Sequence, residues 1–140
     1  MLDSKKLIKP INLAHIPTPL QRMVRISELW GGDVWIKRDD QTGLDLSGNK
    51  VRKLEFLLAE AIEQEADTVI TCGGIQSNHC RATALGCARQ GFKCKLILRG
   101  DPPAELDGNL LLDRLAGAEV RLLSNEEYYN NLDQVFSEMA

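Results

Sequence analysis

The segment T68-V-I-T-C-G-G-I-Q-S-N-H-C-R81 carries most of the information about the fold. Its first five residues are all β-branched or apolar, which is typical of a buried strand. Gly73 and Gly74 are expected to break this strand. Residues 77–90 have the composition of a helix rich in small residues, with Gly91 at its end. A strand that leads directly into a helix predicts one repeating unit of an α/β protein.

The same alternation continues on both sides of this segment. After it we expect a strand that starts near residue 92 and includes 95–98, a helix at 109–115, a strand at 118–123 and a helix at 126–139. Before it we expect a short helix at 23–30, a strand at 34–37 and a long helix at about 50–64. The rest of residues 1–33 is expected to be irregular. Strands and helices in alternation, with short connections, predict a parallel sheet with helices on both faces, a three-layer α/β fold.

A three-stranded parallel sheet leaves its edges uncovered, and the sequence ends inside an expected helix. We therefore expect this chain to be the N-terminal portion of a longer protein, with an incomplete fold.

The composition excludes several classes of function. The chain has 140 residues, 44% of them hydrophobic and 26% charged, which suits one soluble domain. A net charge of -3 argues against a nucleic-acid-binding surface. No apolar run is long enough to cross a bilayer, and no secretory signal is visible, so neither a membrane role nor export is expected and the cytoplasm is the default location.

The cysteine and histidine spacings do not predict a metal site. The four cysteines contain no C-x-x-C pair, and the two histidines, His15 and His79, are far apart. Cys80 and Cys87 share one face of an expected helix, so we interpret them as small buried residues.

The cations at the start of the helix at 50–64 are not equivalent. At about 100° per residue, Lys50 falls within the arc of Leu54, Leu57, Leu58 and Ala61. Arg52 falls on the opposite, solvent side, and Lys53 falls near the edge of the arc. An inward ammonium is costly unless it is paired or neutralised. Either Lys50 extends its amine to water from the helix end, or it serves a ligand, for example as a lysine that forms a Schiff base with a carbonyl cofactor.

Two loops could bind such a ligand. The stretch G43-L-D-L-S-G-N-K50 resembles a P-loop but departs from it, because Asn49 precedes the lysine and Val51 replaces the magnesium-binding hydroxyl. The other loop follows the strand at 68–72, at the carboxyl end of a parallel strand where ligands bind. Ser77 or Asn78 would equally be an ordinary helix N-cap.

Four segments, taken together, carry a family resemblance. They are H15-I-P-T-P-L20, W35-I-K-R-D-D40, L46-S-G-N-K-V-R-K-L-E-F56 and C72-G-G-I-Q-S-N-H-C-R81. From about residue 10 to its end, the chain resembles the D-cysteine desulfhydrase and 1-aminocyclopropane-1-carboxylate (ACC) deaminase family. These are pyridoxal-phosphate (PLP) enzymes with the tryptophan-synthase-β fold. The resemblance implies that residues 1–48 are the first part of the large PLP domain and that 49–140 are the small α/β domain, truncated at its C-terminal end.

The resemblance also implies which residues hold the cofactor. Lys50 would bond covalently to PLP and act in catalysis, and Lys53 would lie near the cofactor phosphate. Asn78 would contact the ring hydroxyl and border the substrate. The residues facing the phosphate and the pyridine nitrogen would lie beyond Ala140.

A small amino-acid substrate would meet the same loop. Ser77 would lie beside its carboxylate and take part in catalysis, while Gln76 and His79 would complete the substrate site. The family members are commonly homodimers, so a homodimer is expected for the full-length protein.

These implications favour a PLP-dependent lyase that converts D-cysteine to pyruvate, hydrogen sulfide and ammonia. ACC deaminases usually read S-N-Q-T-R where this chain reads S-N-H-C-R, which is closer to the desulfhydrase branch. The alternatives are an ACC deaminase that forms 2-oxobutanoate and ammonia, a lyase for another small amino acid, a non-catalytic truncated module and a ligand-binding regulatory domain. The 140-residue chain alone is expected to be inactive.

Overall fold

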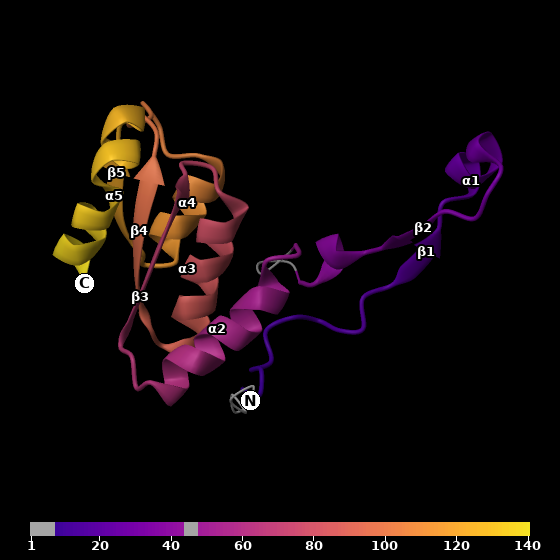
Figure 1. Cartoon of the computed structure of the whole chain (residues 1–140), viewed down its shortest axis with the longest axis horizontal. Coiled ribbons are helices and arrows are strands. Elements are labelled where there is room, and N and C mark those ends of the chain that lie inside the picture. The colour runs from indigo at the N-terminus through magenta and orange to yellow at the C-terminus, as the bar shows by residue number, and fades with distance from the viewer. Residues whose placement is uncertain (1–7, 44–47) are drawn as a thin grey trace, which may run out of the picture.

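The computed structural model describes residues 8–43 and 48–140 (Figure 1). The elements in chain order are β1 (Leu20–Arg22), α1 (Val24–Trp30), β2 (Trp35–Lys37), the 3₁₀ helix η1 (Asp39–Gln41), α2 (Val51–Glu63), β3 (Thr68–Gly74), α3 (Asn78–Gln90), β4 (Lys93–Arg99), α4 (Gly108–Leu115), β5 (Glu119–Leu123) and α5 (Asn125–Met139). The predicted helices and strands are therefore confirmed to within a few residues, whereas β1 and η1 were not predicted.

The main sheet is parallel, as predicted, with the strand order β3-β4-β5. Strand β3 pairs with β4 over its whole length, from Thr68 opposite Lys93 to Gly74 opposite Arg99. Because both strands run in the same direction, the segments that follow them emerge at the same edge of the sheet. The start of α3 and the start of α4 are thereby brought side by side.

Helices cover both faces of this sheet, which confirms the three-layer architecture (Figure 1). Strand β4 alternates its side chains between the two faces, as a pleated strand must. Leu96 and Leu98 join the core formed with α2, α3 and α4, while Ile97 joins Val135 and Met139 of α5. Cys80 and Cys87 are fully buried in the first of these cores, as their spacing predicted.

The prediction that Gly73 and Gly74 break the strand was wrong. Both residues belong to β3 and pair with Leu98 and Arg99. A Cβ atom at Gly73 would lie 2.8 Å from both the Ser77 Oγ and the Cys80 Sγ. The glycine is therefore needed because the first turn of α3 packs directly against the end of the strand.

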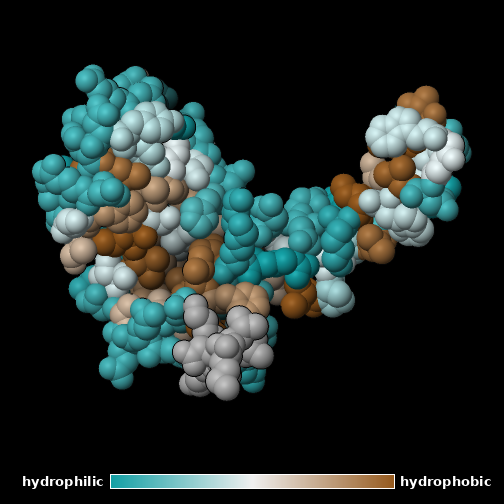
Figure 2. Space-filling view, viewed as in Figure 1, coloured by the Kyte–Doolittle hydropathy of each residue, from teal (hydrophilic) through white to brown (hydrophobic). Residues whose placement is uncertain are grey.

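Residues 20–37 form an arm that projects from the α/β body (Figure 1). Strands β1 and β2 pair in antiparallel register, from Leu20 opposite Lys37 to Arg22 opposite Trp35, and α1 lies at the far end. Apolar side chains are exposed along the arm (Figure 2), including Leu29, which is 80% exposed, and Trp30, which is 71% exposed.

None of the helices in residues 8–43 and 48–140 combines the length and the apolar character that crossing a membrane would require.

Asp113 of α4 is a fully buried carboxylate. Neither of its side-chain oxygens has a hydrogen-bond partner among the described residues. Burial raises the pKa of Asp113 from its ordinary value of 3.8 to about 6, and the positive charge of Arg81 opposes this rise. The folded protein therefore keeps a proton on this group over a pH range in which the unfolded chain has released it.

We expect Asp113→Asn to gain stability relative to the unsubstituted protein as the pH rises. Because the pKa of Asp113 is raised in the folded state, its ionisation destabilises the folded protein by about 2 kcal/mol between pH 4 and pH 7, whereas asparagine does not titrate. Urea denaturation at several pH values measures this difference. Asp133→Asn, at an exposed position of α5, is the control. An unchanged difference in the free energy of unfolding across this pH range would contradict the prediction.

Candidate functional site

The start of α2 and the start of α3 border one cavity of about 290 Å³. It is lined by Asp40, Gly48, Asn49, Lys50, Asn78 and Arg81. Lys50 and Asn78 were singled out from different loops of the sequence, and the structure brings them to the same cavity.

Lys50 immediately precedes α2, at its N-cap position, and its side chain is half-buried. Its carbonyl oxygen accepts the backbone N–H groups of Lys53 at 3.0 Å and Leu54 at 3.1 Å. The lysine backbone is therefore fixed by the first turn of the helix at a position that lines the cavity.

The buried face of α2 is rotated relative to the predicted arc. The buried residues of the helix are Val51, Leu54, Glu55, Leu58 and Ala59, whereas Leu57 is 51% exposed. Lys50 consequently lies at the border of the buried face rather than within it. The prediction of an inward lysine was thus only partly correct, because the helical wheel could not show which side of α2 other segments cover.

The side of α2 that carries Leu57 and Ala61 faces an open apolar groove of about 230 Å³. The groove lies between α2 and β3, and residues 69–71, His79 and Thr83 complete its lining. The apolar stripe next to Lys50 is therefore real, but it is divided: Leu54 and Leu58 belong to the core, whereas Leu57 and Ala61 border the groove.

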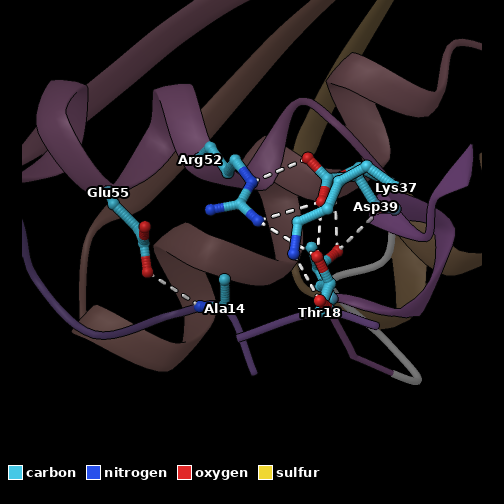
Figure 3. A network of polar contacts seen from close by, with 8 residues as sticks. Ala14, Thr18, Lys37, Asp39, Arg52 and Glu55 are labelled. Atoms are coloured by element: carbon cyan, nitrogen blue, oxygen red, sulfur yellow. Dashed lines mark hydrogen bonds and ion pairs between the residues drawn. The ribbon is translucent and has the colours of Figure 1, made fainter. Parts of the chain in front are cut away.

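Glu55 shows what covers the other side of α2. Its carboxylate is only 6% exposed and accepts the backbone N–H groups of Leu13 at 3.0 Å and Ala14 at 2.9 Å (Figure 3). Hydrogen bonds to an ionised acceptor are among the stronger ones. They hold the N-terminal segment along the helix, on the side that a wheel assigns to solvent.

Arg52 was expected to be ordinary surface, and this was wrong. Its Nε donates to the Asp39 Oδ2 at 2.7 Å, and its Nη2 donates to the Asp39 Oδ1 at 2.9 Å and to the Thr18 Oγ1 at 3.2 Å (Figure 3). Donation by Arg52 and then by Thr18 lowers the pKa of Asp39 to about 2. The guanidinium therefore fastens η1 and the N-terminal segment to the first turn of α2, two residues from Lys50.

The second loop predicted to bind a ligand is the turn between β3 and α3, and hydrogen bonds within it and to β4 fix its shape. Ser77 N donates to Gly74 O at 2.9 Å, and Ile75 N donates to Arg99 O at 3.0 Å. The Ser77 hydroxyl accepts the backbone N–H of Cys80 at 3.3 Å, so Ser77 is the N-cap of α3. A hydroxyl that accepts one hydrogen bond keeps its own hydrogen to donate, so the cap does not prevent a role toward a ligand.

His79 is half-buried between the groove and the lysines. Its Nε2 lies 3.1 Å from the Thr71 Oγ1. Burial lowers the pKa of His79, and the positive charges of Lys50 and Lys53 lower it further. The imidazole is therefore neutral at pH 7, and Lys53, although exposed, is close enough to affect it.

Gln76 is not among the residues that line the cavity, and both ends of its side-chain amide form hydrogen bonds at the start of α4. Asp40 and Arg81, which do line the cavity, were not predicted as site residues. Each is the last residue of a motif used for the family resemblance, and this position was the only indication in the sequence that they belong to the site. Within residues 8–43 and 48–140, no three His, Cys, Asp or Glu side chains are arranged to hold a metal ion.

A family model described as pyridoxal-phosphate-dependent enzyme matches residues 11–140. The chain belongs to this family. The resemblance predicted from the motifs is therefore confirmed, and with it the cofactor expected for the family.

Two curated relatives and one solved structure agree with this assignment. A mitochondrial protein of Arabidopsis thaliana named bifunctional D-cysteine desulfhydrase/ACC deaminase is 57% identical over 122 residues, which are 84% of this chain and 30% of the relative. A protein of Thermotoga maritima, named only provisionally as an ACC deaminase, is 52% identical and is covered to 40%. The crystal structure of an ACC deaminase homologue matches 93% of this chain and 40% of its own, with a TM-score of 0.79 and 41% identity.

A more distant structure supports the fold alone. The crystal structure of O-ureido-L-serine synthase matches with a TM-score of 0.71 at 19% identity. The chain spans 30% of the length of the plant relative and 40% of the Thermotoga relative.

The cavity fits part of a PLP site. An aldehyde cofactor with a ring hydroxyl needs an amine and a hydrogen-bond donor on the same cavity, and Lys50 and Asn78 can supply them. The cations of Lys50 and Arg81 also outnumber the single carboxylate of Asp40 in the lining, which suits an anionic ligand.

The close contact at Gly73 allows a test of whether packing of α3 against the end of β3 stabilises the turn between them. We expect Gly73→Ala to lower the free energy of unfolding by about 1–3 kcal/mol, because its Cβ would overlap Ser77 and Cys80. Gly74→Ala is the matched control, since a Cβ there meets no atom within 4 Å. Urea denaturation of the two variants measures the difference. Equal stabilities would show that α3 does not depend on this close packing.

Proposed function

We propose that the full-length protein containing this chain is a PLP-dependent lyase that acts on a small amino acid. The observation that carries the proposal is the cavity shared by Lys50 and Asn78 at the starts of α2 and α3. The family assignment and the names of the relatives support it.

We assign the cofactor contacts to three residues. Lys50 would hold PLP covalently, the Asn78 amide would donate to its ring hydroxyl, and Lys53 would face its phosphate. When bound, PLP supplies a ring that draws electrons away from the substrate α-carbon. Once freed by substrate, the Lys50 Nζ would accept the α-proton as general base.

The substrate contacts are assigned to the loop that opens α3. The Ser77 hydroxyl keeps a hydrogen that it can donate to a substrate carboxylate. His79, neutral at pH 7, would present a polar ring without adding charge beside the lysines. Gln76 would support the substrate loop indirectly, because its side chain forms hydrogen bonds with Asp107 and Asn109 at the start of α4.

We favour D-cysteine as the substrate, with release of pyruvate, hydrogen sulfide and ammonia. The sequence argument used two positions, His79 and Cys80, but Cys80 is fully buried in the core and cannot reach a substrate. The preference therefore depends on His79. ACC deamination to 2-oxobutanoate and ammonia is the second candidate, because the plant relative is named for both activities.

Four expectations stay predictions. They are the homodimer, the cytoplasmic location, the division into residues 1–48 and 49–140, and inactivity of the 140-residue chain alone.

Replacement of Lys50 tests the central assignment. We expect the full-length protein to develop a visible absorbance band with PLP and, after borohydride reduction, to carry the PLP mass on the peptide containing Lys50. The band and the mass should be lost in Lys50→Ala and kept in Lys93→Ala, an exposed lysine of β4. A band that persists in Lys50→Ala would assign the covalent bond to another lysine.

Product analysis distinguishes the two substrates. We expect the full-length protein to release sulfide from D-cysteine faster than it forms 2-oxobutanoate from ACC, under the same conditions. His79→Gln, which introduces the residue usual in ACC deaminases, should shift the ratio of sulfide to 2-oxobutanoate formation toward 2-oxobutanoate. Faster 2-oxobutanoate formation by the unsubstituted protein would make it an ACC deaminase first.

A further inference from the structure

The N-terminal end of α4 encloses the Gln76 side chain. The Gln76 Oε1 accepts the backbone N–H of Asn109 at 2.7 Å, and its Nε2 donates to the Asp107 Oδ1 at 3.0 Å. Gly108 lies between them with a φ of 49°, and a Cβ atom there would be 2.5 Å from the Gln76 Oε1. Only glycine allows this approach, so Asp107, Gly108 and Asn109 form a close-fitting clamp around Gln76.

The clamp continues into the candidate site through the Asn109 side chain. The Asn109 Nδ2 donates to the backbone carbonyl of Gln76 at 2.8 Å and to the Asn78 Oδ1 at 2.9 Å. Each hydrogen of the Asn109 NH₂ group therefore has its own acceptor. Asn78 in turn lines the cavity that contains Lys50.

These contacts fix the orientation of each amide in turn. A backbone carbonyl can only accept, so the NH₂ end of Asn109 must face Gln76. An NH₂ group can only donate, so the oxygen end of Asn78 must face Asn109. The NH₂ end of Asn78 is then the end that remains for a group in the cavity.

We propose that Asn109 is a positioning residue that sets the Asn78 amide so that it offers hydrogen-bond donors, and not an acceptor, to the bound ligand. The inference rests on the proposed function, because it takes PLP to be the ligand that Asn78 meets. It adds a residue from the first turn of α4 to a site otherwise built around the starts of α2 and α3. Asn109 does not line the cavity and acts only through Asn78.

Asn109→Asp is the sharpest test, because it keeps the shape of the side chain and removes both donors. The carboxylate would repel the Gln76 carbonyl and favour a reversed Asn78 amide, with the oxygen toward the cavity. We expect PLP to bind the full-length variant about tenfold more weakly or worse, which is the scale of one lost hydrogen bond with an unpaired acceptor. Asn109→Ala, which leaves Asn78 free to turn, should weaken PLP binding less.

The controls separate positioning from folding. Asn131→Asp, at an exposed position of α5, makes the same change far from the site and should bind PLP normally. The thermal unfolding midpoint without PLP should fall no further in Asn109→Asp than in Asn109→Ala. A purely structural role of Asn109 would instead lower this midpoint and leave the PLP affinity of the folded protein unchanged. If Asn109→Asp does not fold, the Asn109→Ala affinity decides, and a value equal to the unsubstituted protein overturns the proposal.

Asn78→Ala separates this proposal from the assignment of the cofactor contacts. If Asn78→Ala loses PLP affinity while Asn109→Asp retains it, the positioning role is overturned and the proposed function stands. If Asn78→Ala binds PLP normally, the assigned role of Asn78 fails, and the positioning role fails with it.

A measurement on the unsubstituted protein tests the contact itself. We expect the side-chain NH₂ hydrogens of Asn109 to exchange with solvent at least about tenfold more slowly than those of Asn131, because both are hydrogen-bonded. Nuclear magnetic resonance with labelled asparagine gives both rates in one sample. Equal exchange rates at Asn109 and Asn131 would overturn the proposal without any variant.

Discussion

The candidate site depends on the parallel pairing of β3 with β4. Seven consecutive residue pairs hold the two strands in register and bring their carboxyl ends to one edge of the sheet. The turn that starts α3 and the connection that leads to α4 must then lie side by side, although more than twenty residues separate them. Ile75 N, which donates to Arg99 O at 3.0 Å, extends the pairing by one residue into the turn. A shift of one residue in the β3–β4 register would move the Gln76 amide away from Asn109, and the turn before α3 would lose its hydrogen bonds to α4.

Helix α2 is held from two directions, and this determines where Lys50 lies. The core below it takes Leu54 and Leu58, while the N-terminal segment is fastened to its other side through Glu55 and Arg52. Exposed ion pairs contribute little individually. Arg52, however, makes two contacts with one carboxylate and a third with Thr18, and this geometry limits the ways in which the first turn can move. Lys50, which immediately precedes that turn, is thereby held at the cavity by contacts made by other residues.

The sequence predicted what local patterns determine. Strand and helix positions follow from periodicity and from caps such as Ser77 and Gly91. The motifs singled out Lys50 and Asn78, which the structure brings to one cavity. It did not predict the roles of Arg52 and Glu55, because a helical wheel treats every polar residue as facing solvent until a covering segment is known. It also placed a break at Gly73, where the real constraint was the approach of α3. The role of Asn109 could not be predicted, because it depends on a contact across 31 residues that only the register of the sheet creates.

The contacts around Gln76 and Asn109 explain how main-chain geometry can determine the chemistry of a side chain in a cavity. An amide side chain offers a donor at one end and an acceptor at the other, and rotation by half a turn exchanges them at little cost in shape. A site that requires a donor must therefore break this symmetry. Here the asymmetry begins at two main-chain groups that cannot reverse, the N–H of Asn109 and the carbonyl of Gln76. It passes through the Asn109 side chain to Asn78 without any charged group in the direct path. Because neutral amides carry the orientation, the direction of the Asn78 amide is set without adding a charge beside the Lys50 amine.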